Sequence, residues 1–377
     1  MEGFCIVCRR STTAIPCAKK AASAFATSAG NAWKNSAPPG FRKRRVISIG
    51  RSTTGTWAET SSCWWPGLEG MVFMTSHFSV SVVIPLYNHE RYIEAALESV
   101  WSQVLRPREV IVVDDGSTDG SFEAVSRMSR SFPELVCWSQ PNQGAHYAIN
   151  AGIHRATGDL VAVLNSDDLY HPRRLARCMD VLVSRPDAAA VCTGLGFVDD
   201  GGREINNPWY RESRAFYDKV GDLPLALMNG NFFMTTSNLV IRRRVFEEVG
   251  YFAPLRYAHD LDFFLRLLAR DLEIHFLDEP LLFYRMHGRN TILEEHARVR
   301  VEWAFGCARF LHSLNRFPGR CRRGWDYVDR ITRIVERHSL QRLVMLFLAY
   351  FAGGPAAEER FLQDPEFYRI VHKVAAE

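Results

Sequence analysis

The sequence lacks three features that would indicate common classes of protein. None of its apolar segments reaches the length of about 20 residues that a membrane-spanning helix needs. Of its nine cysteines, Cys5 and Cys8 form one pair, and the other seven are scattered, with no second Cys or His pair at zinc spacing. We therefore expect free thiols in a reducing cytosol. The net charge of +4 over 377 residues is too small to indicate nucleic acid as the partner.

Residues 1–77 lack any sustained helical or strand period. They are rich in Ser, Thr, Ala and Gly, and they carry a basic run at 42–45 but few acids. This composition predicts a disordered leader. It loosely resembles an organelle transit peptide, and a basic leader would also suit a nucleic-acid-associated protein. We favour a third explanation, in which translation begins at Met71 or Met74.

From Ser79 onwards, apolar strand-like runs alternate with helical patterns. The run SVSVVIPLY is typical of a strand buried on both faces. The next segment has apolar residues at helical spacing, and EVIVVDD and DLVAVLNSDD then repeat the strand pattern after short links. Strict alternation predicts an α/β domain over residues 78–294, with a mostly parallel sheet and helices on both faces. Residues 295–377 are predicted to form a helical C-terminal extension.

Two of the predicted strands end in acid pairs, Asp114-Asp115 and Asp167-Asp168. Ligands of such open sheets bind outside the carboxyl ends of the strands. Crowded carboxylates repel each other, and a divalent cation and ligand hydroxyl groups would relieve that repulsion. The pattern therefore predicts a binding site at this edge of the sheet.

Four motifs make the sequence similar to a known family. VVIPLYNHERYIEAALESVWSQ, VIVVDDGSTDGS, NQGAHYAINAGIHRATGDLVAVLNSDDLYHPRRL and YAHDLDFFLRL occur in the order and spacing of family 2 glycosyltransferases. The resemblance covers about Ser79 to Asn290. It implies an inverting enzyme with the GT-A fold, a Rossmann-like sheet flanked by helices, that takes its sugar from a nucleotide-sugar donor.

The resemblance also implies roles for residues at the donor side. Pro85 and Tyr87 would border the nucleotide base. Asp115 would accept a hydrogen bond from the uracil ring, with Asp114 as its companion.

The second acid pair carries the metal motif of the family. Asp167 would lie near the ribose, and Asp168 would bind Mg²⁺ or Mn²⁺. The sequence departs from the family at two positions. Asn165 stands where many relatives have the first acid of the motif, which still leaves an oxygen ligand. Ile149 replaces a frequent Arg, which makes the donor less certain.

Asp260, in HDLDF, matches the catalytic base of the family. From the residues alone it could instead cap the helix that follows. Asp262 could share the acceptor site or only favour the helix N-terminus. His259 is a candidate hydrogen-bond partner of the base. Three further residues could contact the diphosphate or the acceptor, or could serve structure alone: Asn238, Arg285 and His287.

These observations predict transfer of a sugar, with a UDP-sugar as the expected donor, to a hydroxyl group of a glycan or lipid-linked acceptor in cell-surface polysaccharide synthesis. The alternative is a non-catalytic GT-A protein that binds nucleotide only. The apolar run from Val344 to Phe351 predicts a helix that either packs on the catalytic domain or lies on an anionic membrane surface. We expect a cytoplasmic protein, in the second case peripheral at the membrane, and no nucleic-acid partner.

Overall fold

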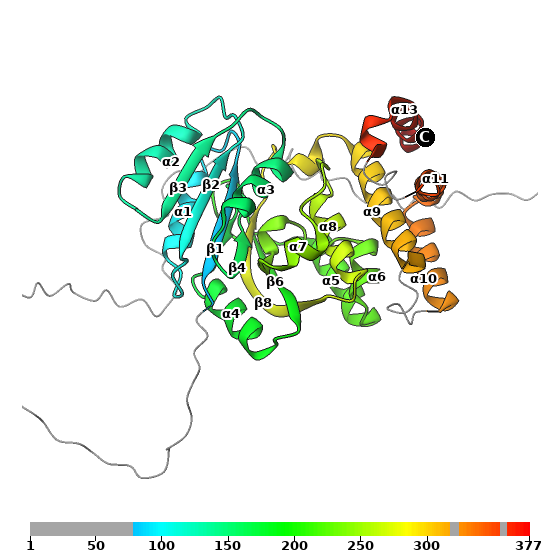
Figure 1. The fold of residues 1–377 in the computed structure, drawn as a ribbon, viewed down its shortest axis with the longest axis horizontal. Helices are drawn as coiled ribbons and strands as arrows, with labels where there is room; N and C mark the ends of the chain where they lie inside the picture. The colour runs from blue at the N-terminus through cyan, green and yellow to red at the C-terminus, as the bar shows by residue number, and fades with distance from the viewer. Residues whose placement is uncertain (1–77, 317–323, 355–359) are drawn as a thin grey trace, which may run out of the picture. The chain divides into compact units, whose positions relative to one another are not determined.

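A computed structural model describes residues 78–316, 324–354 and 360–377 (Figure 1). The predicted leader, with both candidate start methionines, lies outside the described residues. Within them, one sheet has the strand order β3-β2-β1-β4-β7-β6-β8-β5. Its strands are β1 Val80–Leu86, β2 Glu109–Asp114, β3 Leu135–Ser139, β4 Leu160–Val163, β5 Leu169–Tyr170, β6 Ala188–Val198, β7 Val240–Arg242 and β8 Glu273–Arg285.

The sheet is mostly parallel, as the alternation of strands and helices predicted. β1 pairs in parallel with β2 and β4, β2 with β3, and β6 with β8. β7 is antiparallel to both β4 and β6, and β5 is antiparallel to β8. Because β7 is antiparallel to both of its neighbours, β4 and β6 point in the same direction. β6 and β8 therefore run parallel to β1. The carboxyl ends of β1, β2, β4 and β8 therefore face the same edge.

Helices cover both faces of the sheet (Figure 1). Alternate residues of β1 show how the faces divide: Val82 and Ile84 join one hydrophobic core with α1, α2 and α4, whereas Val83 joins the other with α3, α6, α7 and α8. The helices of this part are α1 Ile93–Trp101, α2 Ser121–Ser129, α3 Ala145–Arg155, α4 Arg174–Ser184, α5 Pro208–Val220, α6 Leu223–Asn229, α7 Val245–Val249 and α8 His259–Leu268, with the short 3-10 helix η2 Thr236–Asn238.

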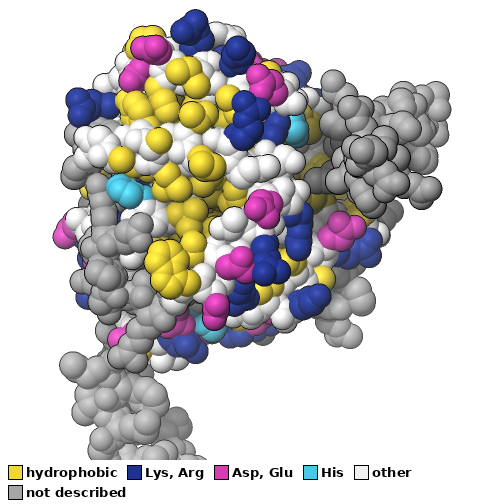
Figure 2. All heavy atoms as spheres, turned by 90° about the vertical axis from the view of Figure 1, so that its right-hand side faces the viewer, with side chains coloured by type: hydrophobic (Ala, Val, Ile, Leu, Met, Phe, Trp, Pro, Cys, Tyr) yellow, Lys and Arg dark blue, Asp and Glu magenta, His cyan; other side chains and the backbone are white. Residues whose placement is uncertain are grey.

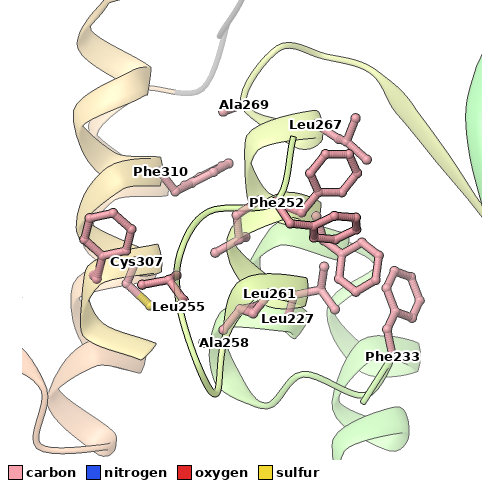
Figure 3. Packing of buried hydrophobic residues seen from close by; sticks show 14 of the residues in the cluster. Leu227, Phe233, Phe252, Leu255, Ala258, Leu261, Leu267, Ala269, Cys307 and Phe310 are labelled. Atoms are coloured by element: carbon pink, nitrogen blue, oxygen red, sulfur yellow. The ribbon is translucent and has the colours of Figure 1, made fainter. Parts of the chain in front are cut away.

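The C-terminal part is helical, as predicted, and continues the second core. It contains η3 Thr291–Leu293, α9 His296–Arg316, α10 Trp325–Arg337, α11 Gln341–Phe351, η4 Phe361–Gln363 and α13 Pro365–Ala376. Figure 3 shows Cys307 and Phe310 of α9 turned toward α8 and the loop before it, where Leu255 and Ala258 lie. The second core of the sheet domain and the C-terminal helices therefore form one continuous hydrophobic core around α8.

The apolar run predicted from the sequence forms most of α11. Its side chains Leu343, Val344, Phe347 and Phe351 are buried in the second core. Met345 instead points outward and is 70% exposed. No helix within the described residues is both long and apolar enough to cross a bilayer.

Candidate active site

Asp115 directly follows β2, and its carboxylate is fixed by the start of α3. It accepts hydrogen bonds from the backbone N–H groups of Gln143 (3.0 Å) and Gly144 (2.7 Å) and from the side-chain amide of Gln140 (3.0 Å). Gly144 has φ +96°, a conformation that L side chains rarely adopt. The turn therefore depends on glycine to aim its N–H at Asp115.

Asp114, the companion acid, closes the loop after β2. Its carboxylate accepts the hydroxyl hydrogen of Ser139 at 2.6 Å and the backbone N–H of Ser117 at 3.3 Å. Both acids of this pair are buried.

In the first motif, Pro85 is buried within β1, whereas Tyr87, just past the strand, is 46% exposed at the edge.

The carboxylate of Asp168 is bonded to two neighbouring elements of the fold. Its carboxylate accepts the hydroxyl hydrogen of Ser237 at 2.6 Å and the backbone N–H of Arg285 at 3.0 Å. Burial, together with the nearby charge of Asp167, raises the pKa of Asp168 well above its usual range. Asp168 thus ties the end of β4 to η2 and to the end of β8.

Asp167 lies in a group of three potential metal ligands with His89 and His287, whose ligand atoms all lie within 4.8 Å of one another. The Nε2 atom of His287 is 3.0 Å from Oδ2 of Asp167. The backbone N–H of Arg289 donates to Nδ1 of His287 at 3.2 Å, so Nε2 is the nitrogen that donates to Asp167. Sequence reasoning missed His89, although it lies within the first motif.

The protonation states of this group suit a cation. Burial opposes ionisation of Asp167, but the hydrogen bond from His287 is the largest of the effects that outweigh it and lower the pKa. Burial also lowers the pKa of His89, which favours the neutral imidazole that can act as a ligand. The ring of Tyr92 stacks on His287 at 5.0 Å between centroids and fixes one side of the group.

Arg285, at the end of β8, braces the backbone of this site. Its Nε donates to the carbonyl of Asp167 at 2.8 Å, and its guanidinium also donates to the carbonyls of Asp199 and Asp200. Its side chain is buried and lies over the ring of Tyr92. These contacts hold the loop after β4 rather than present a charge at the surface.

Asp260 is the second residue of α8, and the whole residue is 6% exposed. Oδ1 accepts the backbone N–H of Leu261 at 2.7 Å, and Oδ2 accepts the side-chain amide of Asn231 at 3.0 Å. Ala258 occupies the N-cap, so Asp260 does not fill the capping position. Burial raises the pKa of Asp260 to about 7. A carboxyl group poised near neutral pH is suited to general base catalysis.

Asp262 is 1% exposed and belongs to a buried ion pair. Its carboxylate accepts from Nε of Arg266 at 2.8 Å and from the guanidinium of Arg309, on α9, at 3.0 Å. Burial opposes ionisation of Asp262, but the charges of Arg309 and Arg266 outweigh it and lower the pKa. The structure therefore joins Asp262 to the C-terminal helices.

Two other predicted residues lie beneath or beside the site. Asn238 is fully buried, with its amide bonded to the backbone of Thr193 on β6 and of Phe233. His259 begins α8, where burial lowers its pKa to about 4 and keeps the ring neutral. Asn231, which holds Asp260, carried no sequence signal because its contact joins residues 29 positions apart.

The start of α8 lies next to η2: Nε2 of His259 is 3.5 Å from Oγ1 of Thr236, and the following residue, Ser237, is bonded to Asp168. Burial, and then the charges of Asp168, Asp167 and Asp260, raise the pKa of the Tyr284 phenol, near the end of β8, well above the usual range. The ends of four strands running in one direction thus bring the two acid pairs and the imidazoles to one edge, with Asp260 beside them.

Comparisons with known proteins agree with this arrangement. Residues 81–250 match the family described as Glycosyl transferase family 2. An uncharacterized glycosyltransferase of Nostoc sp. (strain PCC 7120) is 33% identical over 214 residues, which cover 56% of this chain and 66% of that protein. Hyaluronan synthase of Pasteurella multocida is 29% identical over 218 residues, or 57% of this chain and 21% of that protein.

A solved structure shows the fold. The mannosyltransferase PcManGT from Pyrobaculum calidifontis, in complex with GDP-Man and Mn²⁺, aligns with a TM-score of 0.52 at 19% identity. The alignment covers 80% of this chain and 87% of that chain.

Proposed function

The chain belongs to glycosyl transferase family 2 through residues 81–250, and we propose that it is an inverting enzyme that transfers a sugar from a nucleotide-sugar donor to a hydroxyl group. The donor class that we favour is a UDP-sugar, and the acceptor class is a glycan or a lipid-linked saccharide of the cell surface. The observation that carries the proposal is Asp260, a buried carboxyl group whose pKa is raised to about 7, on a helix that begins next to η2, to which Asp168 is bonded.

In this proposal, Asp260 acts as the general base. Its carboxylate takes the proton of the acceptor hydroxyl while the acceptor oxygen bonds to the anomeric carbon of the donor sugar. The bond from that carbon to the diphosphate oxygen breaks, and the electron pair leaves with the nucleoside diphosphate. Attack from the face opposite the leaving group inverts the anomeric centre. Asn231 and the backbone N–H of Leu261 hold one oxygen each, which fixes the direction of the carboxylate.

Asp115 suits recognition of the donor base. Two of its hydrogen bonds come from the rigid backbone at Gln143 and Gly144, and the third comes from the side chain of Gln140. We assign the uracil N–H to the place of the Gln140 amide, because that amide can rotate away. Tyr87, exposed at the end of β1, would then border the ring.

The residues present fit a divalent cation. Asp167, His89 and His287 offer one carboxylate and two imidazoles within 4.8 Å of one another. A cation bound here would replace the hydrogen bond that Nε2 of His287 makes with Asp167. Imidazole suits transition metals better than Mg²⁺, so this set favours Mn²⁺. When bound, such a cation supplies Lewis-acid stabilisation of the diphosphate leaving group. Family resemblance assigned the metal to Asp168; we propose Asp167 instead, because its carboxylate lies within 4.8 Å of two imidazole ligand atoms, whereas that of Asp168 is bonded to Ser237 and Arg285.

We place the protein at the cytoplasmic face of an anionic membrane. α11 presents Met345 outward, and Trp325 at the start of α10 is 86% exposed. Arg337 and Arg342 precede the run, and Figure 2 shows apolar side chains among Lys, Arg, Asp and Glu on the face that it draws. Such a mixture suits interfacial binding. Cosedimentation with vesicles containing phosphatidylglycerol, but not with pure phosphatidylcholine, is the expected result; absence from both pellets would contradict it.

The alternative is a non-catalytic protein that only binds nucleotide. Retention of Asp260 in a buried, oriented state argues against it, because a binding protein has no need of a base near pH 7. The test is a panel of UDP-glucose, UDP-GlcNAc and GDP-mannose with Mn²⁺. We expect one donor to raise the melting temperature and to release its nucleoside diphosphate slowly with water as acceptor. Binding without any release, with water or with saccharide acceptors, would favour the alternative.

A further inference from the structure

The helix that carries Asp260 has a poor cap of its own. Ala258 is the N-cap of α8 and makes no side-chain cap hydrogen bond. The first N–H groups of a helix need acceptors, and Ala supplies none.

Glu302 of α9 instead binds the N-cap residue and the two residues before it. Its carboxylate accepts the backbone N–H groups of Arg256 at 2.9 Å, Tyr257 at 2.6 Å and Ala258 at 2.9 Å. The side chain is buried, with the whole residue 9% exposed. A carboxylate at this position also complements the positive end of the helix dipole. One residue from the C-terminal region therefore fixes the three residues that lead into α8.

A second contact from α9 holds the other side of Asp260. Arg309 donates to Oδ1 of Asp262 at 3.0 Å. Glu302 and Arg309 are seven positions apart on one helix, which is about two turns, so they share a face. Between them, Cys307 contributes to the apolar contact with α8 and its preceding loop (Figure 3). α9 therefore makes hydrogen bonds to the chain shortly before Asp260, through Glu302, and shortly after it, through Arg309.

We propose that Glu302 is a positioning residue for Asp260, acting with Arg309 to set the direction of the base from the C-terminal helices. This rests on the proposed function, in which Asp260 takes the acceptor proton. Glu302 does not contact the substrate. It fixes residues 256–258, and the backbone of Asp260 follows two residues later. The match to the family ends at residue 250, so the base and the helix that positions it both lie beyond the matched segment.

The charge of Glu302 supports the same conclusion. The charge of Glu302 contributes, after burial, to the raised pKa of Asp260. The carboxylate that positions the base therefore also raises its affinity for a proton.

The test uses the full chain and the isosteric change Glu302→Gln. Gln keeps the volume but offers one oxygen, and its NH₂ group faces backbone donors. We measure release of UDP from UDP-glucose and UDP-GlcNAc with Mn²⁺, the affinity for UDP, and the melting temperature. We expect kcat to fall by between about 10-fold and 100-fold, as small displacements of a reacting group do, while the KM for donor and the Kd for UDP stay unchanged. Glu295→Gln removes an exposed carboxylate next to α9, paired with Arg298, and should leave kcat unchanged.

Arg309→Lys tests the second contact and covers the case in which Glu302→Gln does not fold. Lys keeps the charge but loses the planar fork, so a smaller fall in kcat at constant UDP affinity is expected. Unchanged kcat in the folded variants, or equal losses of kcat and UDP affinity, would overturn the proposal. Asp260→Asn is measured in parallel. If it abolishes turnover while Glu302→Gln is normal, only the positioning role fails; if Asp260→Asn stays active, the proposed base fails and the positioning role fails with it.

Discussion

Asp167 and His287 are 120 positions apart in the sequence, yet Oδ2 of the first and Nε2 of the second lie 3.0 Å apart at one edge of the sheet. The contact joins the loop after β4 to the end of β8, with His89 from the end of β1 close by. Three strands that run in the same direction therefore place one carboxylate and two imidazoles together, where a divalent cation and a diphosphate would bind.

The first prediction concerns which acid of the pair binds the cation. With Mn²⁺, UDP should bind more tightly than with EDTA, and Asp167→Asn or His287→Ala should remove that difference. Asp168→Asn should keep most of it, because neutral Asn resembles the acid form that burial favours at this position. Isothermal titration calorimetry on the three variants decides between the two acids. A loss confined to Asp168→Asn would return the metal to Asp168.

The second prediction concerns the buried ion pair between α8 and α9. Asp262→Ala leaves the Arg266 guanidinium buried without its carboxylate, so the free energy of unfolding should fall by about 3–5 kcal/mol. Asp329→Ala removes an exposed acid at the same i,i+4 spacing from Arg333 and should cost about 0.3–0.5 kcal/mol. Urea unfolding measures both. Equal small losses would show that the Asp262 pair does not stabilise the helix contact.

The third prediction concerns stability and pH. Burial raises the pKa of Asp260 from 3.8 to about 7, so between these values the folded protein binds a proton that the unfolded chain releases. The contribution of Asp260 to stability is therefore complete below pH 3.8 and is lost as the pH rises to about 7. The melting temperature of Asp260→Asn minus that of the wild type should therefore be larger at pH 8 than at pH 5. Calorimetry at both values checks this, and a difference of opposite sign would contradict the burial of an ionisable base.

The fourth prediction concerns turnover and pH. The base acts when ionised, so kcat should rise with pH through about 7 and then level off. The groups that face Asp260 are the Asn231 amide, the Leu261 N–H and the Glu302 carboxylate, with neutral His259 next to it in the chain. Removing the charge of Glu302 should move the midpoint to lower pH. A profile that is flat across pH 7 would exclude Asp260 as the group that limits the rate.

Sequence patterns were sufficient for the parallel part of the fold and for the acids at its strand ends. β1, β2 and β4 are continuous apolar runs, and short links leave them few alternative topologies. The reversal at β7 could not be predicted, because its three residues, Val240–Arg242, carry no period. The length of β8 could not be predicted either, because the strand includes Pro280 and pairs with β6 through register shifts.

The candidate site divides in the same way. Residues within motifs, such as Asp115 and Asp260, could be named as candidates because the motif is local in the sequence. Asn231 and Glu302 were not, because their roles depend on hydrogen bonds to residues 29 and 44 or more positions away. Asn238 was named for its motif, but its amide turns into the core toward β6. Side-chain direction is set by packing, which a single sequence does not display.

The measurement that tests the account most directly is kcat of Asp260→Asn at saturating nucleotide sugar, with UDP affinity determined on the same preparation. Asn keeps the size of the side chain and can still accept from Leu261, but it cannot take a proton at neutral pH. The account predicts that turnover falls by about 100-fold to 10,000-fold while UDP binds as tightly as to the wild type. Turnover close to that of the wild type, in a folded variant that binds UDP normally, would contradict it.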